Sequence, residues 1–164
     1  MAGRPKKKAA GSAGSKKVKP SGPASCAVLW GLDPSSEKGA AVRVVLKEMG
    51  VVARTALPER LGDPAGAFAR MPGFRPALMP YAGPVPAVEE FVLLCGLSDA
   101  QVNEFLARSR EAGCVVGAKA LLTRVNRAWP LAQLIEAVAA EHAANAADAT
   151  GAANVPDAPQ VSNI

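Results

Sequence analysis

One pattern occurs twice between residues 26 and 142, and it constrains the fold more than any other feature of the sequence. Each copy has a short apolar run, a polar segment, an amphipathic stretch that ends in glycine, and a second apolar run. The first apolar run with its polar end, the amphipathic stretch and the second apolar run cover residues 27–33, 34–50 and 51–56 in the first copy, and residues 91–98, 99–113 and 114–122 in the second. The pattern predicts two strand–helix–strand (βαβ) halves.

Apolar periodicity and capping residues indicate where the helices lie. Apolar side chains recur with helical spacing at Val42, Val45, Leu46 and Met49, and again after the second copy at Leu131, Leu134, Ile135 and Val138. Asp33 and Pro34 are expected to open the first helix, because proline loses no hydrogen bond at the first helical position. Ser98 and Gln101 have the spacing of a capping box, which predicts the start of the second helix.

These elements predict an α/β (α+β) sandwich with two βαβ halves and an added C-terminal helix. Because βαβ crossovers are right-handed, we expect both crossover helices on one side of a shared sheet. A ferredoxin-like arrangement is the simplest solution of this kind. A flavodoxin-like parallel sheet is the alternative, although only four clear strands are available for it.

Composition divides the chain into five segments. We expect a disordered basic tail over residues 1–25, the first βαβ half over 26–71 and a proline-rich loop over 72–87. The second half with its C-terminal helix follows over 88–142, and an Ala-rich disordered tail over 143–164, of which residues 143–149 are able to extend the helix. The proline-rich loop is either a covering flap, anchored by Phe74 and Tyr81, or a mobile linker.

The basic residues are concentrated in the N-terminal tail. The chain has 19 basic and 14 acidic residues, and seven of the basic ones lie in residues 1–20, which contain no acid. Residues 21–164 therefore carry a small net negative charge, which argues against a folded basic nucleic-acid-binding domain. The tail itself offers weak, non-specific nucleic-acid contacts or acts only as a solubilising segment. The candidate contacts are Arg4, Lys6, Lys7 and Lys8.

The tail lacks the apolar region of a secretory signal, and no apolar run reaches the roughly 18–20 residues of a membrane span. We therefore expect a cytoplasmic protein with no membrane partner. The three cysteines, Cys26, Cys95 and Cys114, include no CxxC pair, which argues against a disulfide scaffold or a zinc ribbon. We expect reduced core cysteines, no metal and no cofactor.

Unusual polarity gathers at the end of the last predicted strand. Lys119 interrupts an apolar run, and Thr123, Asn126 and Trp129 follow it. Ligands bind at this end of open α/β sheets, so these residues predict a small pocket with Lys119 as its cationic group, for an unknown protein or a small anionic ligand. In the alternative interpretation Thr123 and Asn126 close a turn, Trp129 packs at the edge of the core, and Lys119 extends to the surface.

The same residues carry a resemblance to a known family. The residues that carry it are 93–98, Leu106, Arg110, Gly113, Lys119, Thr123, Asn126 and Trp129. Through these positions, residues 88–142 are similar to a bacterial family known as domain of unknown function 3783 (DUF3783). Pro130 departs from the family, which has a Ser or Thr cap at that position. The family has no established activity, so the resemblance implies an uncharacterised bacterial cytoplasmic protein and no mechanism.

Together these observations favour a small non-catalytic binding or regulatory module. A nucleic-acid-associated protein that acts through its tail is the alternative. An enzyme with Lys119 or a cysteine as nucleophile is a third possibility, but no general base is evident near either group in the sequence.

Overall fold

Two fully buried strands form the centre of a four-stranded sheet. The computed structural model describes residues 24–151. The central strands are β1 (Cys26–Trp30) and β3 (Phe91–Cys95), and the edge strands are β2 (Val52–Thr55) and β4 (Ala118–Leu121). The strand order is β2-β1-β3-β4.

The strand directions confirm the two βαβ halves. Strand β1 pairs parallel with β2, and β3 pairs parallel with β4. The two halves join through the antiparallel pair of β1 and β3, in which Val28 lies opposite Leu93. The α/β class and the C-terminal helix are also confirmed.

The strand order corrects the expected ferredoxin-like arrangement. In that fold each βαβ unit is split, with a strand of the other half lying between its two strands. Here the two strands of each unit are neighbours. The physical reason is the long connection between β2 and β3, which carries two short helices and the proline-rich segment and so replaces the tight hairpin that would set β3 beside β2. The antiparallel central pair also excludes the all-parallel flavodoxin-like sheet.

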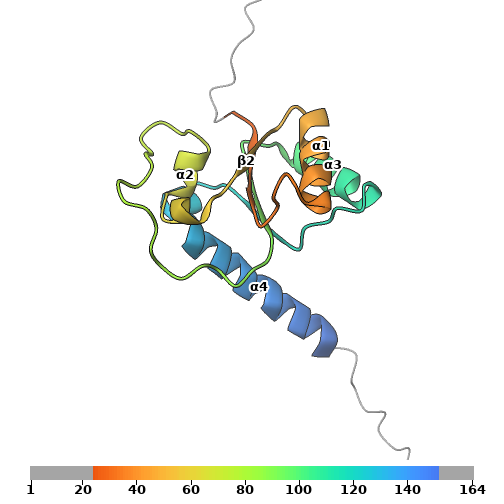
Figure 1. The fold of residues 1–164 in the computed structure, drawn as a ribbon. Helices are drawn as coiled ribbons and strands as arrows, with labels where there is room; N and C mark the ends of the chain where they lie inside the picture. Colours follow the sequence, from red (N-terminus) through yellow and green to blue (C-terminus); the bar gives the residue numbers. More distant parts are fainter. Residues whose placement is uncertain (1–23, 152–164) are drawn as a thin grey trace, which may run out of the picture.

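Helices cover both faces of the sheet (Figure 1). Helices α1 (Glu37–Glu48) and α3 (Asp99–Glu111) lie side by side on one face, as expected from right-handed crossovers. The short α2 (Ala65–Phe68) and the first turns of α4 (Leu131–Gly151) cover the other face. A strand buried on both faces is apolar at every position, which explains the uninterrupted apolar runs of β1 and β3.

The helix starts follow their capping side chains. Ser98 and Gln101 form the expected capping box, since the Ser98 hydroxyl accepts from the Gln101 amide and the Gln101 side chain accepts from the Ser98 amide. The expected start at Asp33 and Pro34 is wrong. The Asp33 carboxylate instead accepts from the Ser35 amide at 2.8 Å in a turn, and Ser36 caps α1 by accepting from the amide of Gly39.

The two halves continue alike after their second strands. Each has a 3-10 helix, η1 (Pro58–Arg60) or η2 (Asn126–Ala128), followed by α2 or α4. The starts of α2 and α4 meet in an isolated antiparallel bridge between Pro64 and Pro130. This correspondence allows positions in one half to be compared with positions in the other.

The proline-rich segment of residues 72–87 lies over η1. The amide of Ala77 donates to the Asp63 carboxylate at 2.7 Å, and the amide of Tyr81 donates to the Glu59 carbonyl at 2.8 Å. Tyr81 also packs against the core cluster between the sheet and helices α2 and α4, which includes Val28, Leu93 and Leu131. The segment therefore covers the first half as a flap, with Leu78 at its exposed tip.

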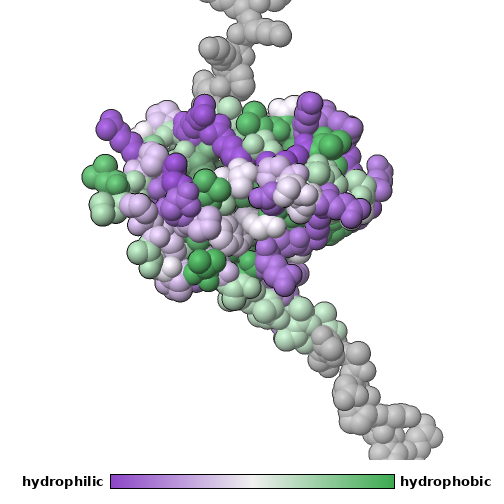
Figure 2. Space-filling model, viewed as in Figure 1, coloured by the Kyte–Doolittle hydropathy of each residue, from purple (hydrophilic) through white to green (hydrophobic). Residues whose placement is uncertain are grey.

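Helix α4 continues past residue 142. Residues 143–149 extend it, as their alanine-rich sequence allows, and its last residue is Gly151. Figure 2 shows this end of α4 emerging from the body of the molecule as a rod of pale, weakly apolar residues. Within the described residues, no helix is both long and apolar enough to cross a membrane. The tail expectations for residues 1–23 and 152–164 lie outside the described residues.

Candidate functional site

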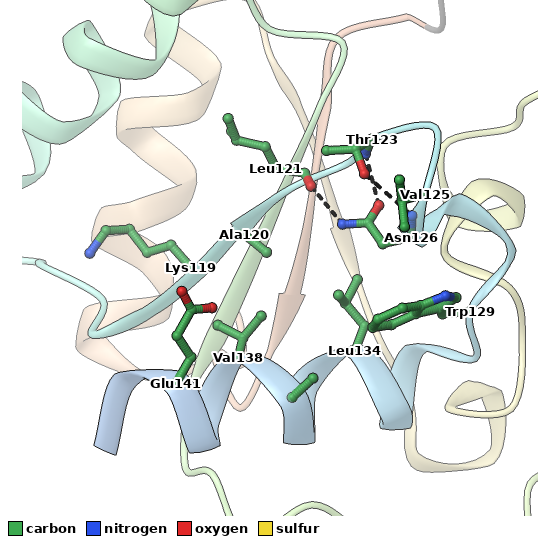
Figure 3. Close-up of a pocket in the computed structure, with 11 residues that line it drawn as sticks. Lys119, Ala120, Leu121, Thr123, Val125, Asn126, Trp129, Leu134, Val138 and Glu141 are labelled. Atoms are coloured by element: carbon green, nitrogen blue, oxygen red, sulfur yellow. Dashed lines mark hydrogen bonds between the residues drawn. The ribbon is translucent and has the colours of Figure 1, made fainter. Parts of the chain in front are cut away.

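A groove of about 410 Å³ runs between edge strand β4 and helix α4. Thr123, Asn126 and Trp129 line one end of it, and Lys119 and Glu141 border the other (Figure 3). The floor and the α4 side are mostly apolar. Their lining residues are Ala120, Val125, Leu134, Ala137 and Val138.

Thr123 and Asn126 close the turn that follows β4. The Asn126 side-chain oxygen accepts from the Thr123 amide at 2.8 Å, and the Thr123 hydroxyl accepts from the Asn126 amide at 3.3 Å. The Asn126 side-chain nitrogen donates to the carbonyl of Leu121 at 2.9 Å. These three bonds close the turn, as the alternative interpretation expects of both residues. The same side chains also border the groove.

The Asn126 side chain occupies part of the outer edge of β4. The Leu122 amide donates to the Leu94 carbonyl of β3, so the main-chain groups of alternate residues, Lys119, Leu121 and Thr123, face away from the sheet. The Asn126 amide group pairs with two of these outward groups, as the peptide group of a neighbouring strand would. Within residues 24–151 no strand pairs with the rest of this edge.

Lys119 is oriented away from the turn. Its ammonium group donates to the main-chain carbonyl of Val116 at 2.6 Å, and Figure 3 shows it pointing away from Thr123 and Asn126. Side chains alternate along a strand, so Lys119 leaves β4 on the face opposite to Ala120. Burial lowers the pKa of the Lys119 ammonium group, and the positive charge of Arg110 lowers it further.

Trp129 is half-buried at the junction of η2 and α4. It packs against the core cluster on this face, and it lies beside Asn126 in Figure 3. Its main-chain carbonyl accepts from the Ala65 amide at 2.9 Å. Trp129 thus joins the two halves and also forms one end wall of the groove.

Sequence reasoning missed the α4 side of the groove. The sequence places Leu134 and Val138 on a helix by their spacing alone, and it gives no role to Glu141. The signal was present in the sequence, because Glu141 continues the same stripe three residues after Val138. The sequence does not show that this stripe faces β4.

The cysteines lie outside the groove. Cys26 and Cys95 are buried in the core between the sheet and α4, and Cys114 is buried in the core between the sheet and helices α1 and α3, so none of them lines the groove. Among the described residues, no group of three or more His, Cys, Asp or Glu side chains lies close enough together to hold a metal ion. The arrangement instead offers apolar contact area beside an open strand edge.

A known protein family matches the part of the chain that contains this groove. Residues 90–144 match the family Domain of unknown function (DUF3783). The DUF3783 match extends from β3 through most of α4, so it includes every residue that lines the groove. No curated protein and no solved structure matches the chain.

The DUF3783 match confirms the resemblance drawn from the Lys119 to Trp129 segment. The proposed nucleic-acid contacts Arg4, Lys6, Lys7 and Lys8 lie outside the described residues and stay a prediction.

Proposed function

We propose that this protein is a non-catalytic binding module, and that the DUF3783 groove takes an extended apolar peptide segment of a partner protein. The observation that supports this most is the open outer edge of β4 directly beside an apolar groove. An extended peptide that adds to a strand edge gains main-chain hydrogen bonds, and it places alternate side chains in the adjoining groove.

The first half of the chain supports a peptide as the ligand. There the extended proline-rich segment lies over η1 and bonds to the Glu59 carbonyl. Val125 is the corresponding residue in the second half. It lies five residues before Pro130, and Glu59 lies five residues before Pro64, the proline that pairs with Pro130. Val125 is 74% exposed, so this position of the second half is open to a ligand.

The ammonium group of Lys119 makes a small anion the weaker candidate ligand. It already donates to a main-chain carbonyl and is directed away from the polar end of the groove. The apolar lining favours a neutral apolar segment instead.

A displayed library of random unstructured peptides, selected on the full chain, tests the proposal. Ala137→Arg places a long side chain in the groove, and Ala140→Arg is the matched control, since both alanines are exposed on α4 and only Ala137 lines the groove. We expect Ala137→Arg to weaken selected peptides about tenfold or more, equivalent to about 1.4 kcal/mol, and Ala140→Arg to leave them unchanged.

Amide NMR shifts and hydrogen exchange locate the bound peptide. Protection of the Lys119 and Leu121 amides supports the proposed strand addition. Peptides that bind equally to both variants, or a failure to select any peptide, would contradict it. A response of Lys119 to inorganic phosphate, without any peptide binding, would favour the small anionic ligand instead.

A further inference from the structure

Cys26 and Cys95 face each other across the centre of the sheet. They are direct partners in the antiparallel pair of β1 and β3, and both belong to the core cluster on the α4 side. Opposite residues in such a pair have Cα atoms about 4.5 or 5.5 Å apart. Both values lie within the range of about 4.4–6.8 Å that disulfides span.

Two arginines make the surroundings of this pair electropositive. Arg54 on β2 lies opposite Val28, two residues along β1 from Cys26 and on the same face of the sheet. Its Nε is buried without a hydrogen-bond partner. Arg70 adds a second positive charge near Cys26. The hydrogen bond with Cys95 lowers the pKa of the Cys26 thiol, and Arg54 lowers it further, while burial acts in the opposite direction.

We infer that Cys26 and Cys95 are an oxidation site, at which a small peroxide converts the two thiols into a disulfide that links the two halves of the chain. This goes beyond the binding function and depends on no part of it. Cys26 is itself buried, but it is the first residue of β1 and follows the half-buried Ser25 and the exposed Ala24, so its sulfur lies near the end of the strand.

The reaction is balanced in two steps. The Cys26 thiolate attacks one oxygen of hydrogen peroxide, the O–O bond breaks, and water leaves after the departing hydroxide takes a proton, giving a sulfenic acid. The Cys95 sulfur then attacks the Cys26 sulfur, so that the S–S bond forms and the S–O bond breaks. The hydroxide leaves as water with the Cys95 proton, and the two thiols have reduced one peroxide to two waters.

Cys114 provides the internal control. It lies in the core cluster on the opposite face, and burial raises the pKa of its thiol. A thiol of this kind reacts slowly with peroxide, because the thiolate is the nucleophile. A general reaction of buried cysteines would modify Cys114 together with the other two.

Peptide mapping of the full chain tests the inference. The chain is treated with hydrogen peroxide, unfolded, alkylated with N-ethylmaleimide and digested without reduction. We expect one cross-linked peptide pair that contains Cys26 and Cys95, removal of that pair by dithiothreitol, and an alkylated Cys114. The same cross-link in Cys114→Ala supports the assignment further.

Three results would overturn it: three alkylated cysteines, a cross-link that includes Cys114, or separate sulfinic acids with no cross-link. Because these results are read from the unsubstituted chain, they do not depend on whether a Cys26 or Cys95 variant folds. Trapping with dimedone at early times gives a second measurement, and it should label Cys26 rather than Cys95.

Discussion

The main chains of Pro64 and Pro130 lie antiparallel and join the two halves of the molecule away from the sheet. The hydrogen bonds on either side are reciprocal, since Ala65 donates to the Trp129 carbonyl at 2.9 Å and Leu131 donates to the Asp63 carbonyl at 3.0 Å. Each half therefore fixes the start of the other half's last helix. This junction also sets Asp63 and Trp129 at corresponding places, one beneath the proline-rich segment and the other in the groove.

Asp63 is expected to hold the proline-rich segment in place. Its carboxylate is only 2% exposed, accepts from the Ala77 amide and pairs with Arg60. Asp63→Ala should cost about 2–3 kcal/mol in the free energy of unfolding, because hydrogen bonds to a buried charge are lost. Hydrogen exchange at Ala77 should become faster in the variant.

Glu59→Ala is the control for this prediction. Glu59 bonds to Tyr81 through its main-chain carbonyl, and its side chain is exposed, so the substitution should leave the segment protected. Equal exchange at Ala77 in both variants would show that Asp63 has no special role.

Asn126→Ala should destabilise the turn after β4. The substitution removes the bonds to the Thr123 amide and to the Leu121 carbonyl, which together correspond to about 1–2 kcal/mol in urea unfolding. Asn145→Ala, on the exposed part of α4, is the matched control and should be neutral or slightly stabilising, since alanine favours helices. Equal free energies of unfolding for the two variants would show that the Asn126 side chain does not stabilise the turn.

Gly31 and Gly50 separate backbone strain from steric clash. Both have a positive φ, of 67° and 71°, but a Cβ at Gly31 would lie 1.6 Å from the Glu89 carbonyl oxygen, whereas one at Gly50 meets nothing within 4 Å. Gly50→Ala should cost about 1–2 kcal/mol from strain alone. Gly31→Ala should cost about 1–3 kcal/mol more, because the main chain at Glu89 must shift. Equal unfolding midpoints would exclude the clash.

The rate of peroxide oxidation at Cys26 should rise with pH and level off near pH 7 rather than near the ordinary thiol value of 9.0. The rate levels off at a lower pH because the lowered pKa makes the reactive thiolate of Cys26 present at neutral pH. The groups that act on Cys26 are Cys95, Arg54 and Arg70. Stopped-time alkylation with mass spectrometry measures the rate at each pH. A rate still rising at pH 9, as expected of Cys114, would contradict the prediction.

Local patterns in the sequence predicted the elements of this fold well. The stripe from Val42 to Met49 and the Ser98 capping box depend only on residues a few positions apart, so the sequence contains all the information they need. The same holds for the turn at Thr123 and Asn126, whose hydrogen bonds span three residues. The resemblance to DUF3783 rests on the same short spacings, and the family match over residues 90–144 confirms it.

Local sequence patterns specify the two βαβ halves, their helices and the apolar character of the central strands. Contacts in the folded chain set the strand order, the second helical layer, the side of β4 from which Lys119 extends and the pairing of Cys26 with Cys95. Periodicity shows which side of an element is buried, but it does not show against what. Strand partners and register depend on contacts between residues far apart in the chain, and here the long connection after β2 selected among arrangements that the local patterns allow equally.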